Sequence, residues 1–220
     1  MGSIQSSIKY YLNQLAIFSN FGKFLSLVML NEILVKISRI ILHKIITFGC
    51  RILSSKSFGI FNEARHNFTN DMEPIFIIFF GPLIEEIMYS LPYTLIYPKE
   101  EERDKNYTLI FGYFMSAICA LVFGRYELIL VNLVLMVIKI KCKQQIWKWA
   151  SIGLYSLSFG IGHSPTNQIN HLLQSILMFS IPKVIYFLGS DYIAKINPLY
   201  GIIFGFVQHT FHNYLSFSRI

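Results

Sequence analysis

Long apolar stretches separated by short polar segments dominate the pattern of the chain. The apolar stretches cover residues 10–31, 33–49, 74–97, 107–138, 150–163, 171–189 and 196–216. A helix needs roughly 20 mainly apolar residues to cross a bilayer, and the alternation of period two that marks membrane β-strands is missing. In lipid, a chain without barrel strands satisfies its backbone only as helices. We therefore predict an all-α, polytopic transmembrane helical bundle of about six to eight helices.

Two of these stretches need a finer description. Residues 33–49 carry a narrow basic stripe, so this helix either spans the membrane or lies at its interface. Residues 107–138 are too long for one crossing and are interrupted around Gly124, which predicts a short helical hairpin.

The clearest polar loop, residues 51–72, suggests a boundary within the chain. We expect residues 1–72 to form N-terminal membrane or interfacial helices followed by this loop. Residues 73–220 are then the functional helical core. A second polar loop is expected at residues 98–106.

Composition supports a membrane protein. The chain has 220 residues, of which 54% are hydrophobic and only 14% charged, whereas soluble domains carry roughly 25% charged residues. The net charge of +7 comes from basic residues near the ends of apolar runs, as in membrane anchoring. The most basic loop, expected at residues 139–149, is placed in the cytoplasm. We predict a multi-pass protein of the cell membrane with lipids as partners and, because no nucleic-acid motif is present, without a nucleic-acid partner.

Two adjacent carboxylates stand inside the apolar stretch 74–97. A charged residue near the bilayer centre costs about 2.5–3.5 kcal/mol, so Glu85 and Glu86 need an explanation. Neighbouring helical residues point about 100° apart, and we expect one glutamate to face a reactive space and the other a second helix. Pro82 should kink the helix and place Glu85 near the start of a new helical section.

Two further apolar segments carry unusual polar residues, namely His163 in one and His209 with Asn213 in the other. If these residues meet the glutamates, they form a membrane-embedded polar cavity. A buried carboxylate can take a proton from water there, and imidazole and carboxamide N–H groups can stabilise an oxyanion. The alternative is structural: the glutamates would form a buried ion pair, for example with Arg125, and His163 would be a core histidine.

The order of three short motifs resembles the CPBP family of intramembrane proteases, the CAAX-processing and bacteriocin-processing group also called Abi. The motifs are "EEIMYS" from Glu85, "FGIGH" from Phe159 to His163, and "HTFHN" from His209 to Asn213, within residues 74–216.

The resemblance implies a role for each matching residue. Glu85 would activate water together with His163, and His209 and Asn213 would form the oxyanion site. Glu86 would be a supporting carboxylate. The substrate class would be peptides or prenylated protein termini at the membrane.

One position departs from the family pattern, because Ser90 stands where the family has arginine. Two functions therefore stay open: an active intramembrane endopeptidase, and a catalytically degenerate relative that acts in bacteriocin immunity or binds peptides. A transporter with a carboxylate proton relay would show inverted repeats, and the sequence has none.

The resemblance also leaves the metal open. Glu85, His163 and His209 would be the ligands of a zinc ion. Because the sequence lacks a helical His-x-x-x-His pair, we expect water activation without a metal.

Overall fold

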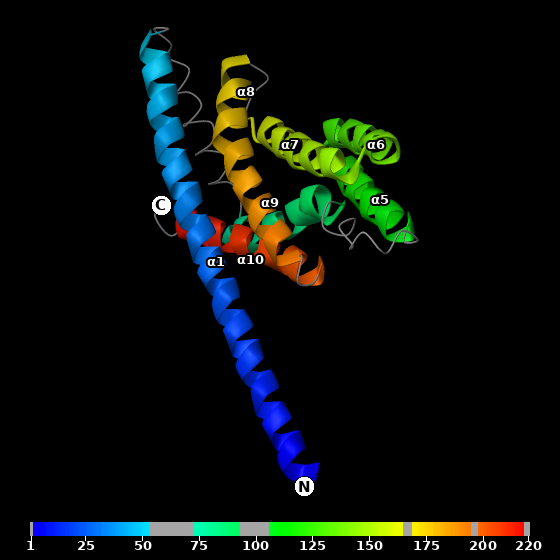
Figure 1. The fold of residues 1–220 in the computed structure, drawn as a ribbon. Coiled ribbons are helices and arrows are strands. Elements are labelled where there is room, and N and C mark those ends of the chain that lie inside the picture. Colours follow the sequence, from blue (N-terminus) through cyan, green and yellow to red (C-terminus); the bar gives the residue numbers. More distant parts are fainter. Residues whose placement is uncertain (1, 53–72, 93–105, 165–168, 195–197, 218–220) are drawn as a thin grey trace.

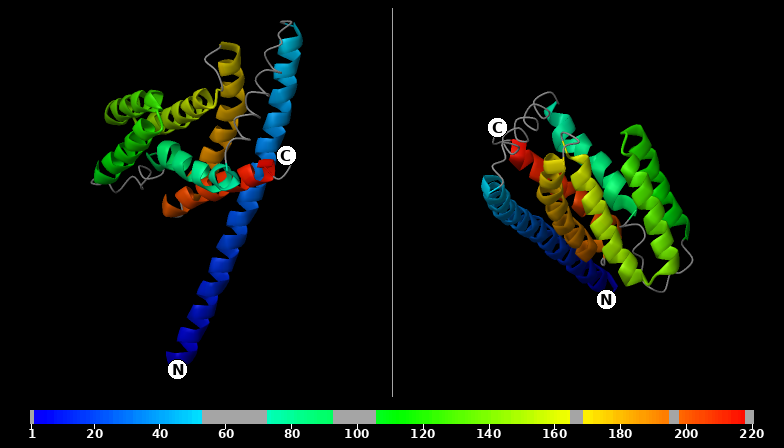
Figure 2. Two further views of the ribbon diagram at one scale, coloured as in Figure 1. Left: turned by 180° about the vertical axis from the view of Figure 1, so that it is seen from behind. Right: turned by 90° about the horizontal axis from the view of Figure 1, so that it is seen from above.

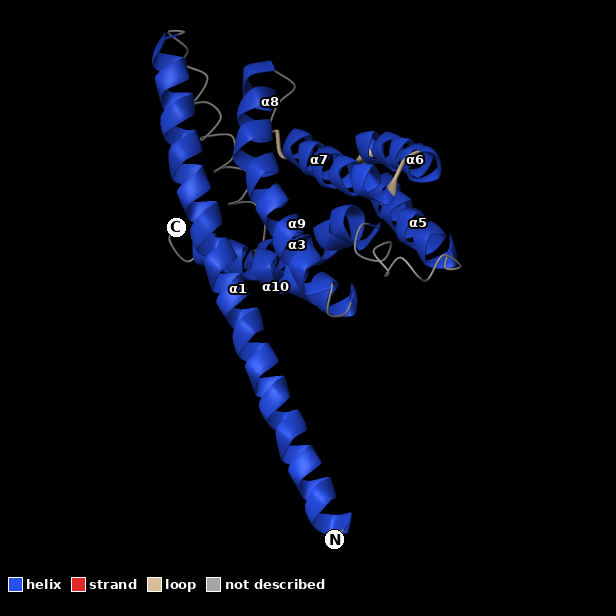
Figure 3. Cartoon of the chain, in the orientation of Figure 1, coloured by secondary structure: helices blue, strands red, loops and turns tan. Residues whose placement is uncertain are grey.

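The computed structural model describes residues 2–52, 73–92, 106–164, 169–194 and 198–217 (Figure 1). In these ranges the chain forms seven continuous helices and no strand (Figure 3). The predicted all-α class is therefore confirmed. One helix of the described ranges, His171–Ala194, is long and apolar enough to cross a membrane. The polytopic arrangement remains a prediction.

The helices follow the apolar stretches of the sequence. Their bounds are α1 (Gly2–Ile52), η1 (Phe76–Phe80), α3 (Gly81–Glu85), η2 (Glu86–Ser90), α5 (Asn106–Val122), α6 (Tyr126–Lys141), α7 (Gln144–Gly162), α8 (Ile169–Ser175), η3 (Ile176–Ser180), α9 (Ile181–Ala194) and α10 (Pro198–Phe217). The segments η1, α3 and η2 form one continuous helix, and so do α8, η3 and α9.

Wide π-helical turns flank the first glutamate. Pro82 lies in the first turn of α3, directly after the π-helical segment η1. Proline lacks the amide hydrogen of a regular helix, and a π-turn is one way to accommodate that loss. Glu85 ends α3 and Glu86 begins the second π-segment, η2. The new helical section thus starts before Glu85, but Glu85 lies at its end and not at its start. π-Turns are frequent at functional sites.

The predicted hairpin at residues 107–138 is confirmed. Helix α5 ends at Val122 and α6 begins at Tyr126. Gly124 has φ +66, the left-handed conformation that commonly ends a helix and that glycine adopts without strain.

Two local expectations were wrong. The stretches 10–31 and 33–49 belong to the single helix α1, because Asn31 and Glu32 face the bundle, where both are buried. The basic segment 139–149 is mostly helical, and only two residues connect α6 to α7. The expected polar loops at 51–72 and 98–106 lie almost wholly outside the described residues.

The long helices pack side by side, with α9 between α1 and α7 (Figures 1 and 2). Helix α10 packs against both α9 and α1, and the helix that carries Glu85 packs against α10 and α5. The N-terminal part of α1 extends well beyond the other helices (Figure 2). The larger buried core lies between η2, the α5–α6 hairpin, α7 and α9, and includes Trp147, Tyr155 and Phe159. This packing brings the three motif segments together.

Candidate functional site

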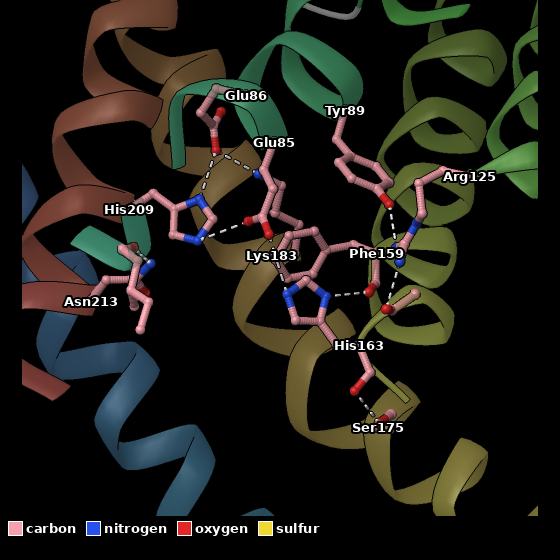
Figure 4. A network of polar contacts seen from close by, with 12 residues as sticks. Glu85, Glu86, Tyr89, Arg125, Phe159, His163, Ser175, Lys183, His209 and Asn213 are labelled. Carbon is pink, nitrogen blue, oxygen red and sulfur yellow. Dashed lines mark hydrogen bonds and ion pairs between the residues drawn. The ribbon is translucent and has the colours of Figure 1, made fainter. Parts of the chain in front are cut away.

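Glu85 lies between two imidazole rings that come from distant parts of the chain (Figure 4). Its Oε1 is 3.3 Å from Nε2 of His163, which follows the end of α7. Its Oε2 is 3.2 Å from Nε2 of His209, in the middle of α10. The predicted meeting of the glutamate motif with both histidine motifs is therefore present in the structure.

His163 is held in one orientation by its surroundings. Its Nδ1 lies 2.8 Å from the carbonyl oxygen of Phe159. A carbonyl can only accept, so Nδ1 carries the hydrogen and Nε2 is directed to Glu85. The ring stacks on Phe179 at a centroid distance of 4.7 Å, and Ser175 Oγ donates to the His163 carbonyl at 3.1 Å. The second motif thus supplies both the imidazole and, through Phe159, the group that fixes it.

Glu86 has Lys183 as a neighbour of its own and shares His209 with Glu85. Its Oε1 accepts a hydrogen bond from Lys183 Nζ on α9 at 2.6 Å and lies 3.3 Å from His209 Nδ1. Helix α10 approaches so closely that a Cβ on Gly205 would lie 2.6 Å from Glu86 Oε2. His209 is consequently placed between two carboxylates, with one ring nitrogen toward each.

Lys183 was missed by the sequence analysis, although a signal was present. It is a lone lysine inside the apolar stretch 171–189. An ionisable residue in such a stretch is a candidate for a buried ion pair or a functional site. The structural alternative named Arg125 as the partner of the glutamates. That assignment was wrong, because the ion pair of Glu86 is with Lys183.

Asn213 lies one turn after His209 and is half-buried. Its Nδ2 donates to the carbonyl oxygen of Ile77, in the π-helical segment η1, at 2.9 Å. The carboxamide therefore ties α10 to the helix that carries Glu85. One amide hydrogen serves this bond, and the second is available for another acceptor.

The site is sealed on one side and accessible on the other. The side chains of Glu85 and His163 are 21% and 29% exposed. Lys183, Glu86 and His209 are all buried. Two surface hollows of the molecule lie elsewhere, one along the start of α7 and one beside His43 on α1. Solvent therefore reaches the site at Glu85 and His163.

The expected zinc ligands do converge, but they do not make a metal site. Each imidazole faces a different oxygen of Glu85, and His209 also faces Glu86. In the part of the chain that the structure describes, no group of three or more His, Cys, Asp or Glu residues is arranged to hold a metal ion. The chemistry below is therefore derived from the protein side chains alone.

A buried hydrogen bond joins α1 to α10 beside the site. Glu32 on α1 lies 3.0 Å from His212 Nδ1 on α10, and both side chains are buried. The ring of Tyr186 lies between the imidazoles of His209 and His212, at centroid distances of about 6 Å. The N-terminal helix is thus joined to the core by a specific polar contact, which sequence reasoning did not predict.

Comparisons with known proteins add no assignment to this geometry. No profile of a protein family, no curated protein and no solved structure matches the chain. The argument for function therefore rests on the side chains around Glu85.

Proposed function

We propose that the protein is an intramembrane endopeptidase that cleaves peptides or protein termini with a water molecule activated by Glu85. The observation that carries the proposal is the contact of one carboxylate with the Nε2 atoms of two histidines from distant helices. Such clusters of acidic and imidazole groups are typical of general acid–base sites. The three motifs resembling CPBP proteases agree with it.

The proposed reaction begins on the accessible side of the site. Glu85, with His163 beside it, takes a proton from water while the water oxygen attacks the carbonyl carbon of the peptide bond. The carbonyl oxygen becomes an oxyanion, and N–H groups of His209 and Asn213 stabilise it. When the carbon–nitrogen bond breaks, the proton held by Glu85 passes to the leaving amine. The products are a carboxylate and an amine, so no further reactant is needed.

Glu86 and Lys183 support this reaction from the sealed side. The lysine balances the charge of Glu86, and Glu86 Oε1 lies 3.3 Å from His209 Nδ1. This contact orients the imidazole so that its Nε2 points toward Glu85. Both residues are positioning groups in this mechanism, because neither touches the side from which a peptide would enter.

A membrane location is part of the same proposal. Large apolar side chains are exposed along α1, for example Ile33, Ile37 and Ile40, and along α6, for example Leu130 and Val137. Lipid would cover these surfaces, whereas in water they would form extensive apolar patches. We propose a multi-pass protein of the cell membrane with lipid and peptide partners.

The test uses the full chain, purified in detergent and reconstituted into liposomes. The probe is a mixed-sequence peptide library, part of which carries a farnesylated C-terminal cysteine, and mass spectrometry identifies the products. Glu85→Gln should lower the cleavage rate about 10²–10⁴-fold, the usual contribution of a general base. Glu73→Gln is the matched control, because Glu73 is exposed just before the same continuous helix, about three turns before Glu85.

The alternative is a degenerate relative that binds a peptide without cutting it. The observation that favours it is Ser90, which stands where the related proteases have arginine. The proposed protease activity would be contradicted if the wild-type protein cut no peptide of the library. It would also be contradicted if Glu85→Gln cut peptides at the wild-type rate. Retention of a library peptide by both forms of the protein would then support binding.

A further inference from the structure

Arg125 joins three structural elements at the edge of the site. It follows Gly124 in the turn between α5 and α6. Its Nη1 donates to the carbonyl oxygen of Gly162 at 2.5 Å, and its Nη2 donates to the hydroxyl of Tyr89 at 2.8 Å (Figure 4). Its Nε lies 3.0 Å from Glu127 Oε1. The planar guanidinium therefore uses a different edge for each neighbour.

Both hydrogen-bond partners are next to residues of the site. Gly162 is the last residue of α7 and directly precedes His163. Tyr89 is one helical turn after Glu85, and its buried ring packs edge-on against Phe159 at a centroid distance of 5.3 Å. Arg125 thus connects the end of the helix that delivers the imidazole to the helix that delivers the carboxylate.

The end of α7 is a favourable place for a cation. The last carbonyl groups of a helix lack intrahelical partners, and they form the negative end of the helix dipole. A side chain at position 162 would also clash, because a Cβ there would overlap the guanidinium of Arg125. Glycine at this position and arginine in the turn are therefore sterically matched.

We propose that Arg125 is a positioning residue that holds His163 against Glu85. It acts through the Gly162 carbonyl on one side and the Tyr89 hydroxyl on the other. The arginine that the CPBP pattern would place at position 90 is missing, and Ser90 is the neighbour of Tyr89.

The test measures the freedom of His163 directly. Diethyl pyrocarbonate modifies imidazole nitrogens that are free to react, and peptide mass spectrometry resolves each histidine of the purified full chain. Arg125→Ala should raise the modification rate of His163 about tenfold, in line with the loss of hydrogen bonds to a charged group. Arg125→Lys, which keeps the charge and one donor, should restore part of the protection. Glu73→Gln, at an exposed position just before the helix that carries Glu85, should leave the modification rate of His163 unchanged.

His212 reports whether the fold is intact. It is buried on α10 and bound to Glu32 of α1, whereas Arg125 contacts Gly162, Tyr89 and Glu127. Its modification rate should not change in Arg125→Ala. An equal rise at His212 and His163 would show general loosening and would contradict a positioning role.

A glycine pair on α7 gives a second test if Arg125→Ala does not fold. Gly162→Ala should displace the guanidinium and release His163 without removing the arginine. Gly153→Ala is the matched control on the same helix, because a Cβ there meets nothing within 4 Å. In the double variant Arg125→Ala with Gly162→Ala, the alanine at position 162 should not raise the modification rate of His163 beyond that of Arg125→Ala alone. An unchanged modification rate of His163 in Gly162→Ala would overturn the proposal.

The consequence for catalysis rests on the proposed function, and the two can fail separately. With the peptide library, Arg125→Ala should lower kcat about tenfold and leave KM unchanged, because the residue orients His163 and does not touch substrate. If His163 becomes more reactive in Arg125→Ala but no form of the protein cuts peptides, the positioning role of Arg125 is supported and the proposed protease activity is contradicted. If cleavage depends on Glu85 but the modification rate of His163 is unchanged in Arg125→Ala, the positioning role is contradicted and the proposed protease activity is supported.

Discussion

Lys183 Nζ on α9 lies 2.6 Å from Glu86 Oε1, and the two side chains are only 1% and 3% exposed. The ammonium group also lies over the ring of Phe159, 5.0 Å from its centroid. Two charges removed from water in this way must stay together, because either one alone would be an unpaired buried charge. The pair therefore fixes α9 against the helix that carries Glu85.

Removal of Lys183 should strongly destabilise the protein. Lys183→Met leaves the buried Glu86 carboxylate without its partner, which costs about 3–5 kcal/mol of unfolding free energy. Unfolding by sodium dodecyl sulfate in mixed micelles measures the change. Lys44→Met, at an exposed position of α1, is the control and should be nearly neutral. The double variant Lys183→Met with Glu86→Gln should recover part of the loss, and an equally unstable double variant would contradict a paired interaction.

Gly205 should tolerate no side chain. A Cβ at this position would lie 2.6 Å from Glu86 Oε2 and 3.2 Å from Ser190 Oγ, so Gly205→Ala forces α10 away from the site. We expect a loss of about 1–3 kcal/mol, as for other overpacked cores. Gly153→Ala, in open space on α7, should instead stabilise by about 0.5–1 kcal/mol, because alanine is the better helix former. The melting temperatures of both variants are compared by thermal unfolding. Similar changes of melting temperature in the two variants would refute the close approach of α10 to Glu86.

Asn213 should contribute to stability as well as to catalysis. Asn213→Ala removes the donor to the Ile77 carbonyl and should cost about 1 kcal/mol, the usual net value of a hydrogen bond. If its second amide hydrogen also stabilises the oxyanion, kcat should fall by about 10²-fold or more. A fall of this size is larger than the loss of folded protein would cause. Unfolding and cleavage of the same preparation are measured together. A variant that loses stability but keeps full kcat would assign Asn213 to structure alone.

Cys142 should report the orientation of the chain in the membrane. It lies exposed in the two-residue connection between α6 and α7, next to Lys141 and Lys143. Basic connections face the cytoplasm, so a membrane-impermeant maleimide should label Cys142 in inverted vesicles and not in intact cells. A chain with Cys50→Ser and Cys119→Ser keeps this thiol as the only target. Labelling of intact cells would reverse the predicted topology.

Parts of the site follow from local sequence patterns. The spacing of Glu85 and Glu86 on one helix predicted different neighbours, and each has one of its own, His163 for Glu85 and Lys183 for Glu86, although they share His209. The length of residues 107–138 and the glycine inside them predicted the α5–α6 hairpin. The apolar stretches predicted helices because hydrophobic length and helical period are properties of a short segment. In each case the cause and its effect lie within a few residues.

Other features depend on contacts between residues far apart in the chain. Nothing near Lys183 in the sequence indicates that its partner is Glu86, 97 residues before it. The structural alternative named Arg125 as an example of a partner for Glu85 and Glu86, whereas the packing of three helices directs it to Gly162 and Tyr89.

The continuity of the N-terminal helix also depends on contacts with distant residues. Glu32 lay between the two predicted apolar stretches, but Asn31 and Glu32 have partners on α9 and α10, and α1 continues through them. Sequence by itself determined that the apolar stretches are helical and that Glu85, His163 and His209 stand out as polar residues within them. Tertiary structure alone decided which charges meet, because burial selects partners by their position in space and not by their distance along the chain.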